Sequence, residues 1–480
     1  MLFSSLLFLF YFFPVTLIVN YCLSFSRPLQ NIWLLITSLF FYAWGEPVLV
    51  MLMIASIMVN WAMGLLVDKY RDNTTKVRII IIVTCVLNLG ALFIFKYLGF
   101  VIRNINMLAG GSLIKFAGFA LPLGISFYTF QSMSYVIDVM RNDARVEKNP
   151  FYVGLYVAFF PQLVAGPIVR YTDIAEQIRH RRFNSSVFFE GCCQFISGMG
   201  KKVLLSNAMA IVADHVFDLS VLGHHVRNIP ASLAWVGLAA YTLQIFFDFS
   251  GYSEMAIGLG RMFGFEFLQN FNYPYISQSV GEFWRRWHIS LGTWFREYVY
   301  IPLGGSRVAN NDKMVRNTFV VWLLTGIWHG AEWTFLIWGL WNLVFLLMER
   351  LIRWDQRRIP RILRHIYLMS VVMIGWLFFR TIDFYQAAQY MLNLFGMNNN
   401  GFYSDMAVML LKENWLFFLI AIVCSTPVVK IFGRLMKEEV MGIWGDIYSM
   451  LMPAVYTVLF VICVTYLAKG NYNPFIYFNF

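Results

Sequence analysis

The stretch Asn317-Thr-Phe-Val-Val-Trp-Leu-Leu-Thr-Gly-Ile-Trp-His-Gly-Ala331 is as apolar as a membrane-crossing helix, yet it contains a histidine, His329. Similar apolar runs recur along the whole chain. Of its 480 residues, 59% are hydrophobic and only 13% are charged. A soluble fold cannot bury so much apolar surface, so the composition indicates a polytopic membrane protein.

The apolar runs approach the length of about 20 residues that crosses a hydrocarbon core about 30 Å thick. They are continuous rather than alternating, which favours helices over barrel strands. We expect an all-α bundle of about eleven transmembrane helices, with some short runs re-entrant or interfacial. The runs cover roughly residues 2–25, 31–45, 48–67, 79–95, 113–137, 151–169, 188–213, 232–262, 317–331, 333–349, 366–380, 414–433 and 448–468.

The chain is expected to form one membrane-embedded domain over residues 1–480, with residues 383–413 as the largest outer loop. Residues 1–14 have no basic start and no cleavage site, so they are interpreted as a retained helix and not as a signal peptide. The six cysteines lie in apolar runs without metal-ligand spacing, so no metal site is predicted.

Positive charge gathers at Arg27 and at residues 68–78, 350–364 and 430–437. The positive-inside rule assigns these segments to the cytoplasm, which puts the N-terminus outside. The net charge of +11 is then mostly a matter of topology. It does not indicate nucleic-acid binding, because no basic stripe lies on a soluble face with stacking aromatics.

Residues 280–301 differ from the neighbouring runs because they are amphipathic. Their spacing predicts a single helix in or near the bilayer interface, rich in tryptophan and arginine. His288 would lie on its apolar, inward face. A core histidine that hydrogen-bonds a neighbour is the alternative interpretation. The predicted apolar face consists of Trp284, Trp287, His288, Leu291, Trp294, Phe295 and Tyr298, and Arg286, Ser290, Thr293 and Glu297 fall on another.

His329 lies about 18 Å along its helix from the basic edge at residues 313–316, at a rise of 1.5 Å per residue, which is near or past the membrane midplane. Thr318, Trp322 and Thr325 share its helix face and give that face a mildly polar character. Ionisable groups at this depth are functional-site candidates. A polar residue that joins two helices is the alternative.

Two glycines beside this histidine, Gly326 and Gly330, form a GxxxG pattern that lets another helix approach closely. Because basic residues bracket 317–349, the two short runs are predicted to form a hairpin with its apex, Glu332, facing outward.

A second polar stripe crosses the apolar run 232–262. One buried polar residue can join two helices, but several that converge indicate a wet pocket. The stripe consists of Tyr241, Gln244, Asp248 and Tyr252.

Several long motifs resemble those of the membrane-bound O-acyltransferase family, specifically its bacterial alginate O-acetylation branch. The resemblance extends over essentially the whole chain. The motifs are Phe159-Phe-Pro-Gln-Leu-Val-Ala-Gly-Pro-Ile-Val-Arg170, Phe247-Asp-Phe-Ser-Gly-Tyr252, Asn270-Phe-Asn-Tyr-Pro-Tyr-Ile-Ser277, Phe283-Trp-Arg-Arg-Trp-His-Ile-Ser-Leu291, Ile301-Pro-Leu-Gly-Gly305, Trp328-His-Gly-Ala331 and Asn473-Pro-Phe-Ile-Tyr-Phe-Asn-Phe480.

The resemblance implies a bundle with a central funnel, a catalytic segment at about residues 240–345 and His329 at its centre. It places His288 at a second position, where the residue type varies across the family. It also implies a multi-pass protein of the bacterial cytoplasmic membrane. Substrate is expected to bind beside four residues of these motifs, Asp248, Asn272, Trp287 and Trp328, and beside Thr325 on the polar helix face of His329.

The expected reaction moves an acetyl group from cytoplasmic acetyl-CoA to an acceptor outside the cell. The donor is a substrate, and no tightly bound cofactor is expected. His329 is predicted to act as a general base, although acylation of the histidine itself stays open. His288 is predicted to orient His329, hold the thioester carbonyl or activate the donor.

Arginines beside the amphipathic segment are candidates for binding the phosphates of the donor, as is the Gly304-Gly305 turn. Ordinary positive-inside charge explains them equally well. These arginines are Arg285, Arg286, Arg296 and Arg307.

Two other classes of function are compatible with polar residues in a membrane: a transporter or channel, and a non-enzymatic scaffold for polysaccharide export. Transporters commonly contain an internal repeat, and no counterpart of residues 280–331 occurs in the first half of the chain. The acceptor is left open between alginate, cellulose, peptidoglycan and related polymers. Because little chain remains to grip a polymer, we expect a periplasmic or extracellular acetyltransferase partner on the outer turns near Glu332 and residues 383–413.

Overall fold

The computed structural model describes residues 1–181, 183–222, 225–226, 228–306, 311–438, 443–470 and 472–476. It is helical apart from one short antiparallel hairpin, β1 (Val221–Leu222) with β2 (His225–Val226). The prediction of an all-α polytopic membrane protein is therefore confirmed. Contacts gather into two compact units, one of residues 1–195 with 252–268 and the other of residues 196–251 with 269–480.

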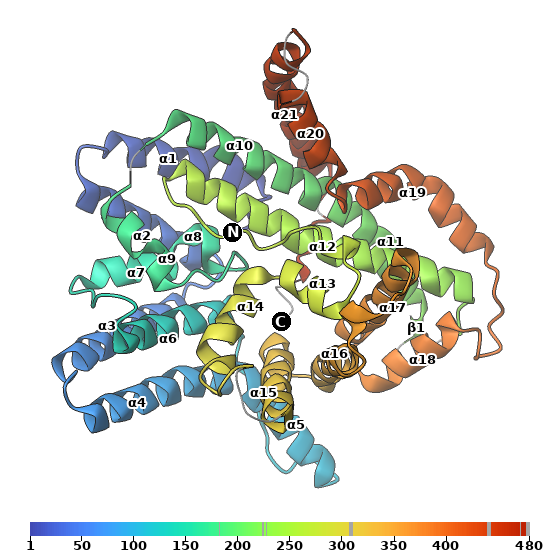
Figure 1. The fold of residues 1–480 in the computed structure, drawn as a ribbon, viewed down its shortest axis with the longest axis horizontal. Helices are drawn as coiled ribbons and strands as arrows, with labels where there is room; N and C mark the ends of the chain where they lie inside the picture. The colour runs from blue at the N-terminus through green and yellow to red at the C-terminus, as the bar shows by residue number, and fades with distance from the viewer. Residues whose placement is uncertain are drawn as a thin grey trace. The chain divides into compact units, whose positions relative to one another are not determined.

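In the first unit, short connections join α1 to α2 and α3 to α4, which run in opposite directions (Figure 1). Helices α3 and α4 are joined across their interface by Asn60 and Asn88, whose amides exchange hydrogen bonds of 3.0 and 2.9 Å. Such amide pairs hold helices together where the surrounding solvent is lipid. The unit contains η1 (Phe8–Phe12), α1 (Phe13–Cys22), α2 (Arg27–Ala43), α3 (Val50–Lys69), α4 (Thr74–Leu92), η2 (Phe93–Tyr97), α5 (Leu98–Leu108), α6 (Ile125–Arg141), α7 (Pro150–Ala158), α8 (Phe160–Leu163), α9 (Tyr171–Arg179) and the first part of α10 (Ser185–Gly200).

The second unit contains both candidate histidines. The long helix α12 (Ala231–Met262) contributes its first part to this unit and its last part to the first unit. The other elements are η3 (Lys201–Ser206), α11 (Asn207–Leu219), η4 (Pro274–Ile276), α13 (Val280–Arg286), α14 (Ile289–Phe295), η5 (Arg296–Tyr300), α15 (Asn311–His329), α16 (Trp333–Leu351), η6 (Trp354–Gln356), α17 (Arg361–Arg380), α18 (Phe384–Leu394), α19 (Asp405–Cys424), α20 (Val428–Glu438) and α21 (Ile443–Lys469).

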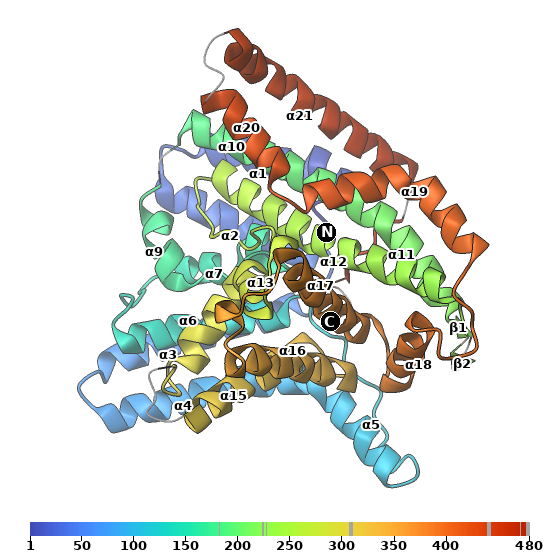
Figure 2. The same cartoon turned by 45° about the vertical axis from the view of Figure 1, so that its right-hand side comes forward.

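Helices α15 and α16 form the predicted hairpin and lie side by side in Figures 1 and 2. Their close approach requires glycine. A Cβ on Gly326 would lie 2.7 Å from the carbonyl oxygen of Phe335, and one on Gly339 would lie 2.7 Å from that of Trp322. The prediction that the glycine pattern beside His329 admits another helix is confirmed, and the helix that it admits is α16.

Seven helices among the described residues are long and apolar enough to cross a membrane, and Phe8–Cys22 is a shorter apolar helix. Helices α2 and α6 have 17 residues each, below the usual length of about 20 residues. The total of about eleven crossings therefore stays a prediction. The seven are Val50–Lys69, Thr74–Leu108, Ala231–Met262, Trp333–Leu351, Arg361–Arg380, Asp405–Cys424 and Met450–Lys469.

Four of the predicted segments are wrong in detail. The run 414–433 is broken between Cys424 and Val428, the run 113–137 becomes helical only at Ile125, and the run 151–169 is interrupted at Phe159. Pro161 explains this interruption, because a proline ring clashes with the carbonyl four residues earlier in a helix. Residues 383–413 are not one loop, since α18 and the start of α19 leave only residues 395–404 between helices.

Candidate active site

His288 lies at a sharp break between two short helices. Helix α13 ends at Arg286, Trp287 is extended, and α14 begins at Ile289. His288 itself has φ +46° and ψ 53°, a left-handed conformation that costs about 1–2 kcal/mol in a residue with a side chain. The prediction of one continuous amphipathic helix over 280–301 is therefore wrong, although His288 does point inward and is 2% exposed.

The break is held by Asn270, a residue that the sequence interpretation did not select. Its Oδ1 accepts hydrogen bonds from the backbone N–H of Ser290 at 3.1 Å and from the Ser290 hydroxyl at 2.9 Å. Its carbonyl oxygen accepts from the N–H of Ile289 at 2.9 Å. Three hydrogen bonds accepted by a buried asparagine thus hold the first turn of α14.

The same Asn270 oxygen fixes the tautomer of His288. It lies 3.1 Å from Nδ1 of the histidine. Because a backbone N–H can only donate, the Asn270 atom bonded to Ser290 must be the acceptor oxygen. Nδ1 therefore carries the proton and donates to Asn270, which leaves a lone pair on Nε2.

The free lone pair of His288 is held in an apolar environment. Nε2 is buried and has no hydrogen-bond partner among the residues that the structure describes. The rings of Phe249 and Phe271 pack against the imidazole at 4.6 and 6.5 Å. Burial lowers the pKa of His288 to about 3, so the side chain is neutral near pH 7. It can accept a proton or a hydrogen bond at Nε2 and donate nothing there.

His329 occupies the last turn of α15 and is 4% exposed. Aromatic rings surround its imidazole, with centroid distances of 4.9 Å to Trp328, 4.8 Å to Trp338 and 5.2 Å to Phe379. Its predicted helix face is buried as well, since Thr325 is 8% exposed. The Thr325 hydroxyl donates a hydrogen bond to the carbonyl of Val321 at 2.7 Å, within the same helix.

Trp328 brings the two histidines to one place. Its indole contacts the ring of His288 at 6.2 Å and the ring of His329 at 4.9 Å, and it is 4% exposed. Two histidines 41 positions apart in the chain thus contact the same buried side chain. An imidazole in such a place can accept or donate a proton during acyl transfer.

Trp287 belongs to the aromatic packing behind His288. It is 3% exposed and contacts Phe283 at 5.6 Å and Trp376 at 4.7 Å. Its role in the structure is to support the wall of the enclosure.

Asp248 has a structural partner that the sequence interpretation missed. Its carboxylate pairs with Lys202 at 2.6 Å, and both side chains are 1% exposed. It also accepts the N–H of Ile476 at 2.8 Å. The available signal was a basic and an acidic residue within neighbouring apolar runs, because charges inside a membrane usually pair.

Asn272 is exposed, and its backbone forms hydrogen bonds with Arg286. Its backbone N–H donates to the carbonyl of Arg286 at 2.9 Å, and its carbonyl accepts from the guanidinium of Arg286 at 3.2 Å. The buried asparagine of the Asn-Phe-Asn motif is Asn270, and binding of substrate beside Asn272 stays a prediction.

The arginines proposed for the donor differ in their surroundings. Arg285 is exposed, whereas Arg286 forms an ion pair of 2.9 Å with Glu282. Arg296 lies 3.2 Å from its neighbour Glu297. Arg307 lies outside the described residues.

The Gly304-Gly305 turn does not present its amides to an anion. The N–H of Gly304 donates to Ile301 and that of Gly305 to Tyr300, both at 2.9 Å. The side chain of Asn317 closes the turn by donating to the carbonyl of Gly305 at 3.1 Å. The prediction of a phosphate-binding turn here is therefore wrong.

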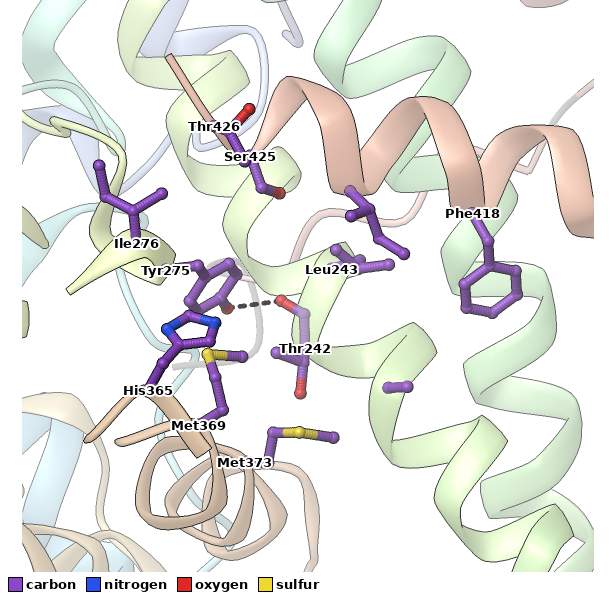
Figure 3. A pocket seen from close by; sticks show the side chains of 12 residues that line it. Thr242, Leu243, Tyr275, Ile276, His365, Met369, Met373, Phe418, Ser425 and Thr426 are labelled. Atoms are coloured by element: carbon purple, nitrogen blue, oxygen red, sulfur yellow. Dashed lines mark hydrogen bonds between the residues drawn. The ribbon is translucent and has the colours of Figure 1, made fainter. Parts of the chain in front are cut away.

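A separate apolar cavity of about 260 Å³ lies in the same unit (Figure 3). Leu243, Met369 and Phe418 contribute its apolar lining. The hydroxyl of Tyr275 donates to the carbonyl of Thr242 at 2.6 Å, the bond drawn in Figure 3. The cavity has the chemistry of a hydrocarbon site and its lining includes neither candidate histidine.

A family model described as MBOAT, membrane-bound O-acyltransferase family, matches residues 31–382. The match includes both histidines, Asn270 and Trp328. This chain belongs to the membrane-bound O-acyltransferase family. The prediction of an O-acyltransferase is confirmed, and the transporter and scaffold alternatives are dropped.

Three of the curated proteins that are similar to this chain illustrate the range of names. The chain is 43% identical over 384 residues to "Probable alginate O-acetylase AlgI" of Azotobacter vinelandii, covering 79% of this chain and 75% of the relative. It is 33% identical over 432 residues to "Peptidoglycan O-acetyltransferase" of Helicobacter pylori, covering 83% and 80%. It is 30% identical over 234 residues to "Teichoic acid D-alanyltransferase" of Bacillus subtilis, covering 47% and 58%.

Proposed function

We propose that this O-acyltransferase moves an acetyl group from acetyl-CoA, on the cytoplasmic side of the bacterial cytoplasmic membrane, to a hydroxyl on the outer side. The acceptor is a polysaccharide hydroxyl or a serine of a partner protein. The relatives named for alginate and peptidoglycan O-acetylation match most of this chain, which favours acetyl over D-alanyl transfer. The observation that carries the proposal is the burial of two imidazoles against one indole, that of Trp328.

In the proposed reaction, His329 removes the proton of the acceptor hydroxyl while the hydroxyl oxygen attacks the thioester carbonyl. A C–O bond forms, the C–S bond breaks, and the thiolate of coenzyme A leaves and takes up the proton. A buried imidazole suits this task because apolar surroundings favour its neutral, basic form. The depth predicted for His329 lets it serve a donor on one side and an acceptor on the other.

The tautomer of His288 argues against one of its three predicted roles, that of holding the thioester carbonyl. Nδ1–H is committed to Asn270, and the only other ring nitrogen is an acceptor. A neutral His288 therefore has no proton with which to hold the thioester carbonyl. We propose that Nε2 accepts a hydrogen bond from the acceptor hydroxyl, or from an N–H of His329, and so aligns the proton that is transferred.

On the donor side we propose Arg285 as the contact for coenzyme A phosphates. It is exposed at the end of α13, whereas Arg286 is already neutralised by Glu282. An exposed guanidinium matches phosphate geometry without first breaking an ion pair.

A partner on the outer face is part of the proposal, because α18 and the short segment 395–404 offer little surface for gripping a polymer. The partner would be an acetyltransferase with a Ser-His-Asp site that docks near Glu332 and this segment.

The test is reconstitution of the chain in vesicles with radiolabelled acetyl-CoA on one side and alginate or peptidoglycan fragments on the other. With the partner protein added on the far side, label should reach that side in the wild type and not in His329→Ala. Label that never crosses would refute transmembrane acetyl transfer. Efficient acetylation of polymer by this chain alone would refute the need for a partner, and acetylation that requires the added partner would support it.

A further inference from the structure

The first unit contains a polar cavity of about 430 Å³, bounded by the loop after α1, the start of α2 and the loops that follow α9 and α12. Three arginines line it, Arg27, Arg181 and Arg261, and the one carboxylate in its lining, Glu266, is exposed. We call it the arginine cavity. Such an excess of positive charge in a hollow attracts anions.

Arg181 is the buried member of the set, with 5% of its surface exposed. Its Nη1 donates to Oδ1 of Asn31 at 2.8 Å, and its guanidinium stacks on the ring of Phe265 at 4.4 Å. Its Nη2 is buried and has no hydrogen-bond partner within the part of the chain that the structure describes. A buried charged donor without an acceptor is costly, so this nitrogen calls for an anionic oxygen.

The neighbouring charges strengthen this requirement. Arg27 donates to the backbone carbonyl of Arg181, which holds the two residues close together. Burial, followed by the charge of Arg27, lowers the pKa of Arg181 to about 9. Arg261 has only a loose ion pair with Glu190 at 3.7 Å, whose side chain is 59% exposed. An anion in the cavity would relieve the repulsion between the guanidinium groups.

An apolar groove of about 570 Å³ adjoins the arginine cavity and shares two residues with it, Tyr21 and Phe183. Leu17 and Ile18 of α1 and Phe188 of α10 add further apolar surface. Ile18 and Phe183 are 61% and 63% exposed, so the groove opens to the outside of a membrane protein, where hydrocarbon is the solvent. The site thus offers positive charge at one end and an apolar surface at the other.

We propose that the arginine cavity and the apolar groove together bind one anionic phospholipid, with its phosphate on Arg181 and Arg261 and an acyl chain along α1. The groove favours a lipid over a soluble phosphate, because only an amphiphile uses both halves. Anionic lipids are enriched in the cytoplasmic leaflet, the side to which the positive-inside rule assigns Arg27. The site lies in the first unit and does not rest on the proposed function.

The test uses the purified full chain in nanodiscs of phosphatidylcholine, with and without phosphatidylglycerol. Native mass spectrometry should show phosphatidylglycerol retained in preference to phosphatidylcholine, and phosphatidylglycerol should raise the melting temperature. Arg261→Gln should weaken its retention about tenfold, as expected for loss of one charged hydrogen bond. Arg181→Gln should weaken it at least as much.

Arg145→Gln is the matched control, because Arg145 is an exposed arginine of the same unit outside the cavity, and it should behave as wild type. Equal retention in wild type and Arg261→Gln would overturn the proposal, even if Arg181→Gln failed to fold. A melting shift with inorganic diphosphate or coenzyme A in detergent, as large as that with phosphatidylglycerol, would also overturn it in favour of a soluble anion.

Discussion

The two histidines of the second unit are positioned by different physical means. His329 sits in the last turn of α15, a regular helix of 19 residues, where the helix repeat alone aligns it with Thr325. His288 sits between two helices of seven residues each, in a left-handed conformation held by Asn270, 18 positions earlier. A regular helix places a side chain by its repeat, whereas a break places it by contacts with a distant residue.

Replacing His329 with alanine should have the largest effect on activity. Loss of a general base costs about 10²–10⁴-fold in rate, and we expect this loss in kcat for acetyl transfer in proteoliposomes. The melting temperature should stay close to that of the wild type. His365→Ala is a control in the same unit, at a histidine whose Nδ1 lies 3.3 Å from the carbonyl of Ser277. An alanine variant at 329 with activity within a few-fold of wild type would remove this residue from the reaction.

Asn270→Ala should lower kcat by about 10–100-fold, the range for loss of a partner that orients an imidazole. The change frees Nδ1 of His288 and lets the unwanted tautomer form. Asn272→Ala is the matched control, since that residue is exposed and bonds Arg286 through its backbone. Equal loss of activity in the two alanine variants would contradict a catalytic role for the hydrogen bond from Nδ1 of His288 to Asn270.

Gly326→Ala should destabilise the α15–α16 hairpin and with it the enclosure of His329. Its Cβ would lie 2.7 Å from a backbone oxygen that cannot rotate away, and overpacking of this kind costs about 1–3 kcal/mol. Gly90→Ala in α4 is the control, because nothing lies within 4 Å of its added Cβ. The readout is the melting temperature, and equal melting of the two variants would contradict tight glycine packing.

The pH dependence of stability should report on His288. Burial lowers its pKa from 6.5 to about 3. Between these values the unfolded chain binds a proton at this residue and the native chain does not. Above pH 6.5 the buried neutral histidine does not lower the free energy of unfolding. As the pH falls from 6.5 toward 3, the free energy of unfolding decreases by at most about 1.4 kcal/mol per pH unit. His288→Gln should melt with a weaker dependence between pH 7 and pH 5, and an unchanged slope would mean that the histidine is not buried neutral.

Arg285→Gln should have the smallest effect, a several-fold rise in KM for acetyl-CoA with kcat nearly unchanged, the pattern of lost ground-state binding. Arg286→Gln is its counterpart and should change KM less, because its charge is already paired with Glu282. The kinetics of both variants are measured against acetyl-CoA concentration. An unchanged KM in both would assign these arginines to membrane topology alone.

Much of the fold and of the His329 region followed from the sequence, because helix geometry repeats. The hairpin, the glycine contact and the buried face of α15 all follow from spacing of three and four residues. The surroundings of His288 did not follow, since an amphipathic pattern cannot show that one residue adopts positive φ. The cost of that conformation is offset by hydrogen bonds that Asn270 accepts from Ser290, which no local pattern reveals.

The sequence also could not show which asparagine of the Asn-Phe-Asn motif is buried. Asn270 and Asn272 belong to one motif, and the chain there is neither helix nor strand, so no periodicity says which one points inward. Only the tertiary contact with Ser290 distinguishes them. In the same way, the donors of the Gly304-Gly305 turn are used by nearby carbonyls, and glycine spacing carries no information about that.

The buried pair of Asp248 and Lys202 has a consequence for how the protein is made. Asp248 also accepts the N–H of Ile476, and Lys202 donates to the carbonyl of Pro474, so this polar cluster is completed by residues synthesised more than 220 positions after Asp248. Until these last residues have joined the fold, the Asp248–Lys202 pair lacks two of its hydrogen bonds. A chain that ended before Pro474 would bury the pair with fewer partners and should be less stable than the full chain.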